Sequence, residues 1–175
     1  MCPTKTNNSH AHRDDLAGEH PFGDAGQLII AIIFLVVWIT DSFFFRYSTF
    51  LNKYIPLAVQ ITVGLILLLV SLIMARSGMK IVFGEFREKP EVIRNGIFGI
   101  VRHPVYLSEI LLYLSLLIFR TSLAALAIWI IAIGFFHYIS RYEEKLLLQR
   151  FGDEYRKYMK EVPMFLPKIK IKRNK

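Results

Sequence analysis

The chain alternates between long apolar runs and stretches rich in charged residues. Four runs carry almost no charge, at residues 28–45, 54–75, 104–119 and 121–140. Each approaches the length of about 20 residues that an α-helix needs to cross a bilayer. Glu109 is the one carboxylate inside the third run, and the second run holds no charged residue. This pattern predicts an all-α membrane protein with about four transmembrane helices.

The short connection between the third and fourth runs, and the spacing of apolar residues after them, predict how the C-terminal helices are arranged. Pro104 suits the first turn of a helix, so the third span should begin there. Only residues 120–122 separate the third span from the fourth, which predicts a tight antiparallel hairpin. After residue 141, apolar side chains recur at helical steps, which predicts an amphipathic helix on the headgroups or on the preceding loop, interrupted near Gly152. These side chains are Leu147, Phe151, Tyr155 and Tyr158.

The polar stretches predict the division of the chain. Residues 1–26 form a polar N-terminal arm, and residues 27–175 form a single membrane domain. The arm contains histidines and carboxylates without regular ligand spacing, so we predict no metal site there. The alternative for residues 18–24 is an ordered lid over a site. Residues 76–102 mix basic and acidic side chains and are expected to connect two spans outside the membrane, with a short interfacial piece around 79–83.

Basic residues give the chain a formal charge of +8. They lie where the apolar runs end, without interleaved base-stacking side chains, so we expect contact with membrane lipids and not with nucleic acid. The arm, the middle connection and the C-terminal region hold 19 of the 22 Lys and Arg residues. By the positive-inside rule, a multi-pass protein of this pattern has both termini in the cytoplasm. The lone Cys2 cannot form an internal disulfide.

Two polar clusters should meet where the third helix begins and the fourth leaves the membrane. One cluster is Arg102, His103, Tyr106 and Glu109, and the other is His137, Arg141, Glu143 and Glu144. Ionisable groups at membrane depth are costly unless they bind something or pair with each other. Two interpretations stay open: a ligand pocket, or an ion-paired plug in which Arg141 pairs with Glu109 or Arg102 with Glu144. The N–H groups at the helix start also form a seat for an anion.

Two motifs around this hairpin carry a family resemblance. One is Gly96-Ile97-Phe98 followed by Arg102-His103-Pro104-Val105-Tyr106, and the other is Glu143-Glu144 followed by Phe151-Gly152-Asp153-Glu154-Tyr155, Tyr158, Val162-Pro163 and Pro167. Over residues 80–168 the chain resembles the isoprenylcysteine carboxyl methyltransferase and phospholipid methyltransferase family of membrane enzymes. The resemblance implies a methyltransferase that holds S-adenosylmethionine in a cytosol-facing pocket and takes a lipophilic acceptor from the bilayer.

The resemblance also implies roles for individual residues. The expected cofactor-binding residues are Arg102, His103, Pro104, Tyr106, Glu143 and Glu144. The expected catalytic residues are Glu109, Arg141 and His103. Relatives often have an arginine four residues before the Glu pair, where this chain has Ile139, so Arg141 is the nearest candidate to position the acceptor. Relatives also often have an arginine near the Val-Pro element, where this chain has Met164. The acceptor itself is left open: a prenylcysteine carboxylate, a phospholipid amine, or a small lipophilic thiol or amine.

Two rival functions remain. Membrane sterol and enoyl reductases have a similar Arg-His-Pro-x-Tyr element followed by a glutamate, but they use NADPH and are generally longer. A non-enzymatic four-helix membrane scaffold would need only ion-paired helix ends. Binding of S-adenosylhomocysteine or of NADPH would distinguish these functions.

Overall fold

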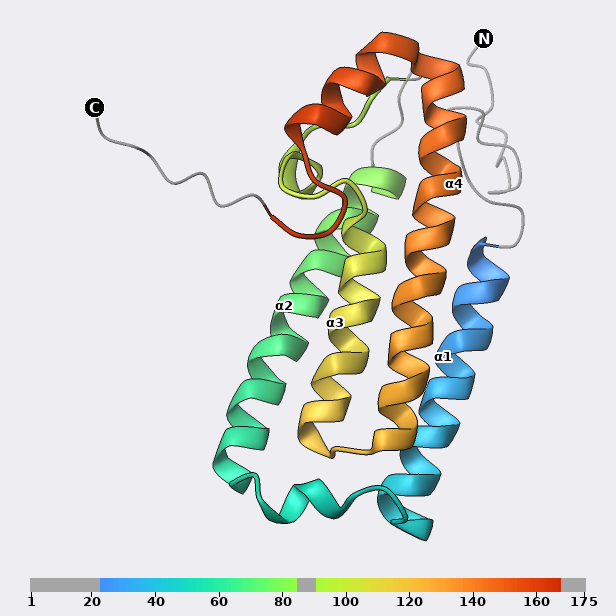
Figure 1. Cartoon of the computed structure of the whole chain (residues 1–175). Coiled ribbons are helices and arrows are strands. Elements are labelled where there is room, and N and C mark those ends of the chain that lie inside the picture. Colours follow the sequence, from blue (N-terminus) through green and yellow to red (C-terminus); the bar gives the residue numbers. More distant parts are fainter. Residues whose placement is uncertain (1–22, 85–90, 168–175) are drawn as a thin grey trace, which may run out of the picture.

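A computed structural model describes residues 23–84 and 91–167 of the chain (Figure 1). Within these residues every regular element is helical, which confirms the predicted all-α fold. The long helices are α1 (Gly23–Ile39), α2 (Leu57–Gly84), α3 (Pro104–Phe119) and α4 (Leu123–Glu161). The predicted lid at residues 18–24 is described only from Gly23 onward. The histidines of the arm and the basic tail after Pro167 lie outside the described residues.

The helices match the predicted membrane spans closely. By length and composition, three described helices can cross a bilayer: Gly23–Phe45, Leu57–Val82 and Leu123–Glu161. The first of these includes a π-helical turn, Thr40–Phe45, which extends α1. The shorter apolar helix α3 begins at Pro104, as the sequence predicts. Most apolar side chains of α1 and α2 point away from the protein core, as is expected for helices that face lipid.

Two helices extend beyond the ranges that the sequence predicts for them. The helix α1 begins at Gly23, inside the stretch predicted as a polar arm. The helix α2 continues to Gly84, although residues 76–83 were expected to leave the helix for a connection. Charged side chains mark the point at which a helix leaves the apolar layer, but they do not interrupt the backbone hydrogen bonds of that helix. At Gly78 the helix α2 passes α3 so closely that an added Cβ would lie 3.0 Å from Cγ2 of Val105.

The four helices run side by side in the order α2, α3, α4 and α1 (Figure 1). The predicted hairpin is present, because residues 120–122 join α3 to α4. At its centre the rings of Phe34 from α1 and Tyr113 from α3 stack with centroids 4.5 Å apart. Both belong to a buried cluster that includes Phe136 of α4. The hairpin therefore brings the start of α3 beside α4 at one end of the bundle, which we call the motif end.

The opposite end, which we call the turn end, is held by a buried carboxylate. Asp41 is 7% exposed and accepts hydrogen bonds from the hydroxyl of Ser48 and, at 2.6 Å, from the hydroxyl of Ser122. The position of Asp41 is fixed by Ser48, which follows it in the next turn, and by Ser122, which is distant in the sequence. Ser122 also caps α4 by accepting from the Ala125 N–H at 3.1 Å.

A sharp break at Gly152 divides α4 and turns the chain back over the motif end. Gly152 has φ +54° and ψ −124°, a backbone conformation open to glycine and strained for other residues. Beyond it, Tyr155 and Tyr158 pack with Val92 of the loop before α3, and the Tyr158 hydroxyl donates to the Phe98 carbonyl at 2.7 Å. The amphipathic helix is thus confirmed, and it lies on the preceding loop.

Candidate functional site

The start of α3 is bonded to the returning C-terminal chain through its backbone. His103 stands at the N-cap of α3, with Pro104 in the first turn. The N–H of Arg102 donates to the Pro163 carbonyl at 3.0 Å, and the N–H of His103 donates to the Met164 carbonyl at 3.3 Å. The two sequence motifs are therefore parts of one structural unit.

The side chain of Arg102 joins both halves of α4. Its Nε donates to Oε1 of Glu144 at 2.7 Å. Its Nη1 donates to the carbonyls of Met159 and Val162 at 2.8 and 2.6 Å. Of the two ion pairs considered from the sequence, Arg102–Glu144 forms, with both side chains buried. Because arginine presents a rigid set of donors, this arrangement fixes the part of α4 after Gly152 over the part before it.

His103 and Tyr106 bring both glutamates of the pair to the start of α3. His103 Nε2 lies 3.3 Å from Oε1 of Glu144, and its Nδ1 lies 3.6 Å from Oε2 of Glu143. The hydroxyl of Tyr106 donates to Glu143, and its ring stacks nearly parallel to the imidazole with centroids 5.7 Å apart. Burial lowers the pKa of His103, against the opposing effect of the Glu144 carboxylate. The imidazole is therefore neutral near pH 7.

One carboxylate oxygen of Glu144 accepts a hydrogen bond, and the other has no hydrogen-bond partner. The residue is 2% exposed, and its Oε1 accepts from Arg102 and contacts His103. Its Oε2 is buried and has no hydrogen-bond partner. Buried carboxylate oxygens are rarely left unpaired, so this atom points to a ligand or water that donates to it.

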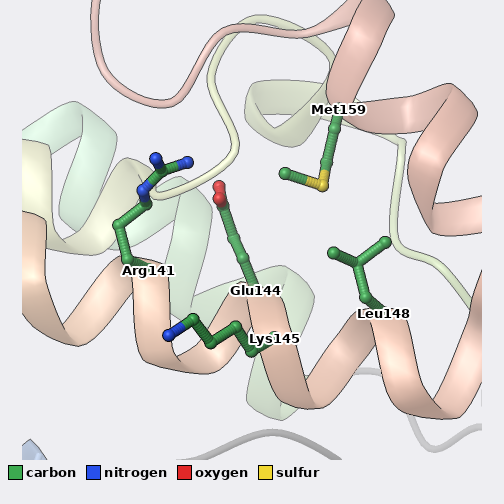
Figure 2. A pocket seen from close by; sticks show the side chains of 5 residues that line it. All are labelled: Arg141, Glu144, Lys145, Leu148 and Met159. Atoms are coloured by element: carbon green, nitrogen blue, oxygen red, sulfur yellow. The ribbon is translucent and has the colours of Figure 1, made fainter.

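A pocket lies beside Glu144, between the two halves of α4 (Figure 2). It has a volume of about 340 Å³, at the lower end of the range of small-molecule sites. Figure 2 shows Glu144 and Leu148 rising from one helix toward Met159 on the other. The lining residues are Arg141, Glu144, Lys145, Leu148 and Met159. The exposed cations Arg141 and Lys145 therefore border a pocket whose far wall is apolar.

The structure does not bring every candidate residue to this pocket. Arg102, His103 and Glu144 contact each other, and Tyr106 and Glu143 adjoin them through His103. Arg141 lines the pocket directly. Glu109 does not line it: this residue lies farther along α3, where its Oε2 accepts from the Tyr113 hydroxyl at 3.5 Å.

Sequence reasoning missed the apolar wall of the pocket. Leu148 and Met159 lie on opposite sides of Gly152 and face each other only because the chain reverses there. The sequence signal is the Gly152-Asp153 interruption of an otherwise helical pattern, which predicts a break in the helix but not the direction in which the chain turns. A glycine at the end of an amphipathic run is a frequent point of chain reversal.

Comparison with known families adds one finding. The family model described as "Phospholipid methyltransferase" matches residues 55–154. The matched region contains Arg102, His103, Glu143 and Glu144, whereas Met159 lies beyond it. No curated protein matches the chain.

Proposed function

Since this chain belongs to the phospholipid methyltransferase family, we propose that it is a membrane methyltransferase that uses S-adenosylmethionine and acts on a lipophilic acceptor. The family implies methyl transfer, and the helices imply a multi-pass membrane protein. Beyond what the family and the helices imply, the proposal specifies the methyl donor, the position of that donor and the class of acceptor. It also places the donor-binding part within residues 80–168 of a single domain.

The observation that carries the proposal is the buried, unpartnered Oε2 of Glu144, a residue that lines the pocket. A carboxylate oxygen accepts hydrogen bonds from ribose hydroxyls. Leu148 and Met159 offer an apolar wall suited to an adenine ring, and Arg141 or Lys145 can pair with a carboxylate. The residues present therefore fit S-adenosylmethionine in charge, polarity and size.

The seat for the donor's carboxylate differs from the one that the sequence first indicated. The start of α3 was expected to hold an anion, flanked by Arg102 and His103. Glu143 and Glu144 approach that helix start through Tyr106 and His103, so a second anion there would be repelled. We assign the carboxylate instead to the cations Arg141 and Lys145 at the edge of the pocket. Arg102 then acts through Glu144, because its Nε and Nη1 hydrogen bonds go to protein atoms.

S-adenosylmethionine supplies a methyl group activated by the neighbouring sulfonium. The protein's contribution is to align the reactants and exclude water, because positive charge disperses as the methyl group moves. The ring of Tyr106, which could face such a cation, is stacked against the rings of His103 and Phe136. A carboxylate acceptor needs no base, whereas an ammonium acceptor must first lose a proton. The neutral imidazole of His103 and the carboxylate of Glu109 are the candidate bases.

A scaffold function has one observation in its favour, the buried Arg102–Glu144 pair that closes the motif end. A scaffold predicts no heat protection by small ligands. The proposed methyltransferase predicts that S-adenosylhomocysteine raises the unfolding temperature of the purified protein. Protection by NADPH instead would favour a reductase related to the sterol and enoyl enzymes.

The direct test is transfer of a labelled methyl group. Purified protein in detergent is incubated with methyl-labelled S-adenosylmethionine and fractionated lipids of its source membrane. The proposal predicts label in one lipid-soluble fraction, and the chemistry of that product identifies the acceptor. A control with Glu144→Gln should transfer much less label. Equal labelling by both proteins would contradict the assigned site, and no labelling by the unmodified protein would contradict the function.

A further inference from the structure

The part of α4 after Gly152, which we call the returning helix, is bonded to the loop that precedes α3 (Figure 1). It carries Met159, which lines the pocket. Arg102 at the end of the loop donates to the carbonyls of Met159 and Val162. A second arginine of this loop, Arg94, contacts the same helix and belongs to neither sequence motif.

Arg94 makes three contacts with the returning helix. Its Nη2 donates to the Glu154 carbonyl at 2.7 Å, and its Nη1 lies 3.4 Å from Oε2 of Glu161. Its guanidinium lies over the Tyr158 ring, 5.5 Å from the ring centroid. Residues 154, 158 and 161 follow each other at steps of four and three, so they share one face of the helix. One side chain of the loop therefore holds two turns of the returning helix.

The three contacts differ in their expected strength. The side chains of Arg94 and Glu161 are 35% and 66% exposed, and ion pairs at such positions contribute little to stability. The hydrogen bond to the carbonyl is charge-assisted, and the cation–π contact is made to a buried ring. Because Met159 directly follows Tyr158, contacts that hold Tyr158 also hold the apolar wall of the pocket.

The break at Gly152 does not fix the direction of the returning helix by itself. Among the described residues, no other part of the protein packs within 4 Å of the place where a Cβ on Gly152 would lie. The orientation of the helix depends instead on the contacts that it makes beyond the break. Besides the two arginines, these are the hydrogen bond from Tyr158 to the Phe98 carbonyl and the packing around Val92.

We propose that Arg94 is a positioning residue for the methyl donor, because it keeps Met159 opposite Leu148 in the arrangement that binds the donor. This inference rests on the proposed function, since the donor is the S-adenosylmethionine of the same site. Arg94 does not line the pocket and acts through the returning helix. If the wall is in place in only a fraction of molecules, the apparent affinity falls by that fraction. Saturating donor restores the wall, so the maximal rate is kept.

The test compares Arg94→Gln and Arg94→Lys with the matched control Arg156→Gln. Arg156 is an exposed arginine of the returning helix, but its partner Asp153 lies on that helix as well. The control therefore removes the same charge without releasing the helix from the loop.

Four quantities are measured on each purified protein in detergent. Titration calorimetry gives the dissociation constant of S-adenosylhomocysteine. Methyl transfer to fractionated source-membrane lipids gives kcat and the KM for S-adenosylmethionine. Thermal unfolding gives the stability, and hydrogen exchange of the amides in residues 153–164 reports how firmly the returning helix is held, whatever the protein binds.

We expect Arg94→Gln to raise the dissociation constant of S-adenosylhomocysteine and the KM for S-adenosylmethionine by about threefold to tenfold, with kcat kept within about twofold. Amides in residues 153–164 should exchange faster in this variant, whereas those of α3 should not. Arg94→Lys keeps a cation but not the planar set of donors, so its values should be intermediate. Arg156→Gln should behave as the unmodified protein.

Three outcomes would overturn the inference. If Arg94→Gln bound S-adenosylhomocysteine as tightly as the unmodified protein, Arg94 would not position the donor, while the proposed function stood. If kcat and the unfolding temperature fell and KM did not change, Arg94 would support only the fold. If the unmodified protein bound no S-adenosylhomocysteine, the proposed function would be wrong and this role of Arg94 with it, even where hydrogen exchange showed that Arg94 holds the helix. Should Arg94→Gln fail to fold, Arg94→Lys decides between these outcomes by the same measurements.

Discussion

Glu144 combines a structural and a binding role in one side chain. Its Oε1 completes the ion pair with Arg102, and its buried Oε2 has no hydrogen-bond partner. The two interpretations left open by the sequence, an ion-paired plug and a ligand pocket, are therefore compatible. The ion pair with Arg102 and the contact with His103 hold the Glu144 carboxylate in position.

His103 should make the stability of the protein depend on pH. Its pKa in the folded protein lies below the ordinary value of 6.5, because the imidazole is buried. Well above the ordinary pKa of 6.5 the imidazole is neutral in the folded and unfolded states alike, and this histidine adds no pH dependence there. As the pH falls further, the unfolded chain binds a proton that the folded site resists. The free energy of unfolding should therefore decrease on acidification.

Thermal unfolding in detergent between about pH 5 and pH 7 measures this effect. The variant His103→Gln should show a flatter pH dependence than the unmodified protein over that range. Leu166→Ala, which changes an exposed side chain, should keep the original dependence. Equal pH dependence in all three proteins would show that His103 is not buried in neutral form.

At the scale of elements, the break at Gly152 determines whether the pocket exists. The substitution Gly152→Ala places a side chain at φ +54°, a strain that costs about 1–3 kcal/mol. We expect a lower unfolding temperature and weaker binding of S-adenosylhomocysteine, because Met159 would no longer face Leu148. Gly134→Ala is the matched control: its added Cβ meets nothing within 4 Å, so stability and binding should be kept. Unchanged binding in Gly152→Ala would contradict a role for the chain reversal.

The turn end should contribute stability without affecting binding. The substitution Asp41→Asn weakens the hydrogen bonds that this side chain accepts from the hydroxyls of Ser48 and Ser122. Hydrogen bonds to a charged group contribute about 1.5–3 kcal/mol each. A fall of about 2 kcal/mol in the free energy of unfolding is expected, with unchanged S-adenosylhomocysteine affinity. The control is Asp153→Asn, which changes a carboxylate of the exposed Arg156–Asp153 ion pair and should alter neither the free energy of unfolding nor the affinity. A loss of affinity in Asp41→Asn would show coupling between the two ends.

The sequence predicted the membrane helices well because burial in lipid imposes a simple rule. Long uncharged runs identified α1, α2, α3 and the first half of α4, and Pro104 identified the start of α3. The end of α2 was not predictable from charge, because Arg76 and Lys80 lie on a helix that continues beyond the apolar layer. The burial of Asp41 depends on the nearby Ser48 and on Ser122, which lies 81 residues away, and no local pattern shows the second contact.

The candidate site was predictable only where the hairpin itself forms it. The connection between α3 and α4 is short, so the two helices must run antiparallel and the start of α3 lies beside α4. The pairing of Arg102 with Glu144 could therefore be predicted. The place of Met159 could not, since it depends on the direction in which the chain turns at Gly152. Glu109 is predicted because it is a carboxylate in an apolar run, but it is not among the residues that line the pocket.

For the whole molecule, the distribution of Lys and Arg predicts that the motif end faces the cytoplasm. The single native Cys2 precedes α1, whose first residue lies at the motif end. A membrane-impermeant maleimide should therefore label Cys2 in inside-out vesicles and not in intact cells or right-side-out vesicles.

The control moves the thiol to the other end of the bundle. In a Cys2→Ser background, Tyr47→Cys places a thiol at an exposed position of the turn end, where the native side chain is 84% exposed. This variant should show the reverse labelling pattern. Labelling of Cys2 from outside would overturn the proposed cytoplasmic position of the termini and of the donor pocket.

The most direct test of the account is the affinity of the protein for S-adenosylhomocysteine, measured by titration calorimetry in detergent. We predict binding by the unmodified protein and by Glu154→Gln, an exposed glutamate on the same helix. Glu144→Gln, verified as folded, should bind about tenfold or more weakly, because a charged acceptor is lost. Equal affinity of the three proteins, or no binding by any of them, would contradict the claim that Glu144 holds the methyl donor.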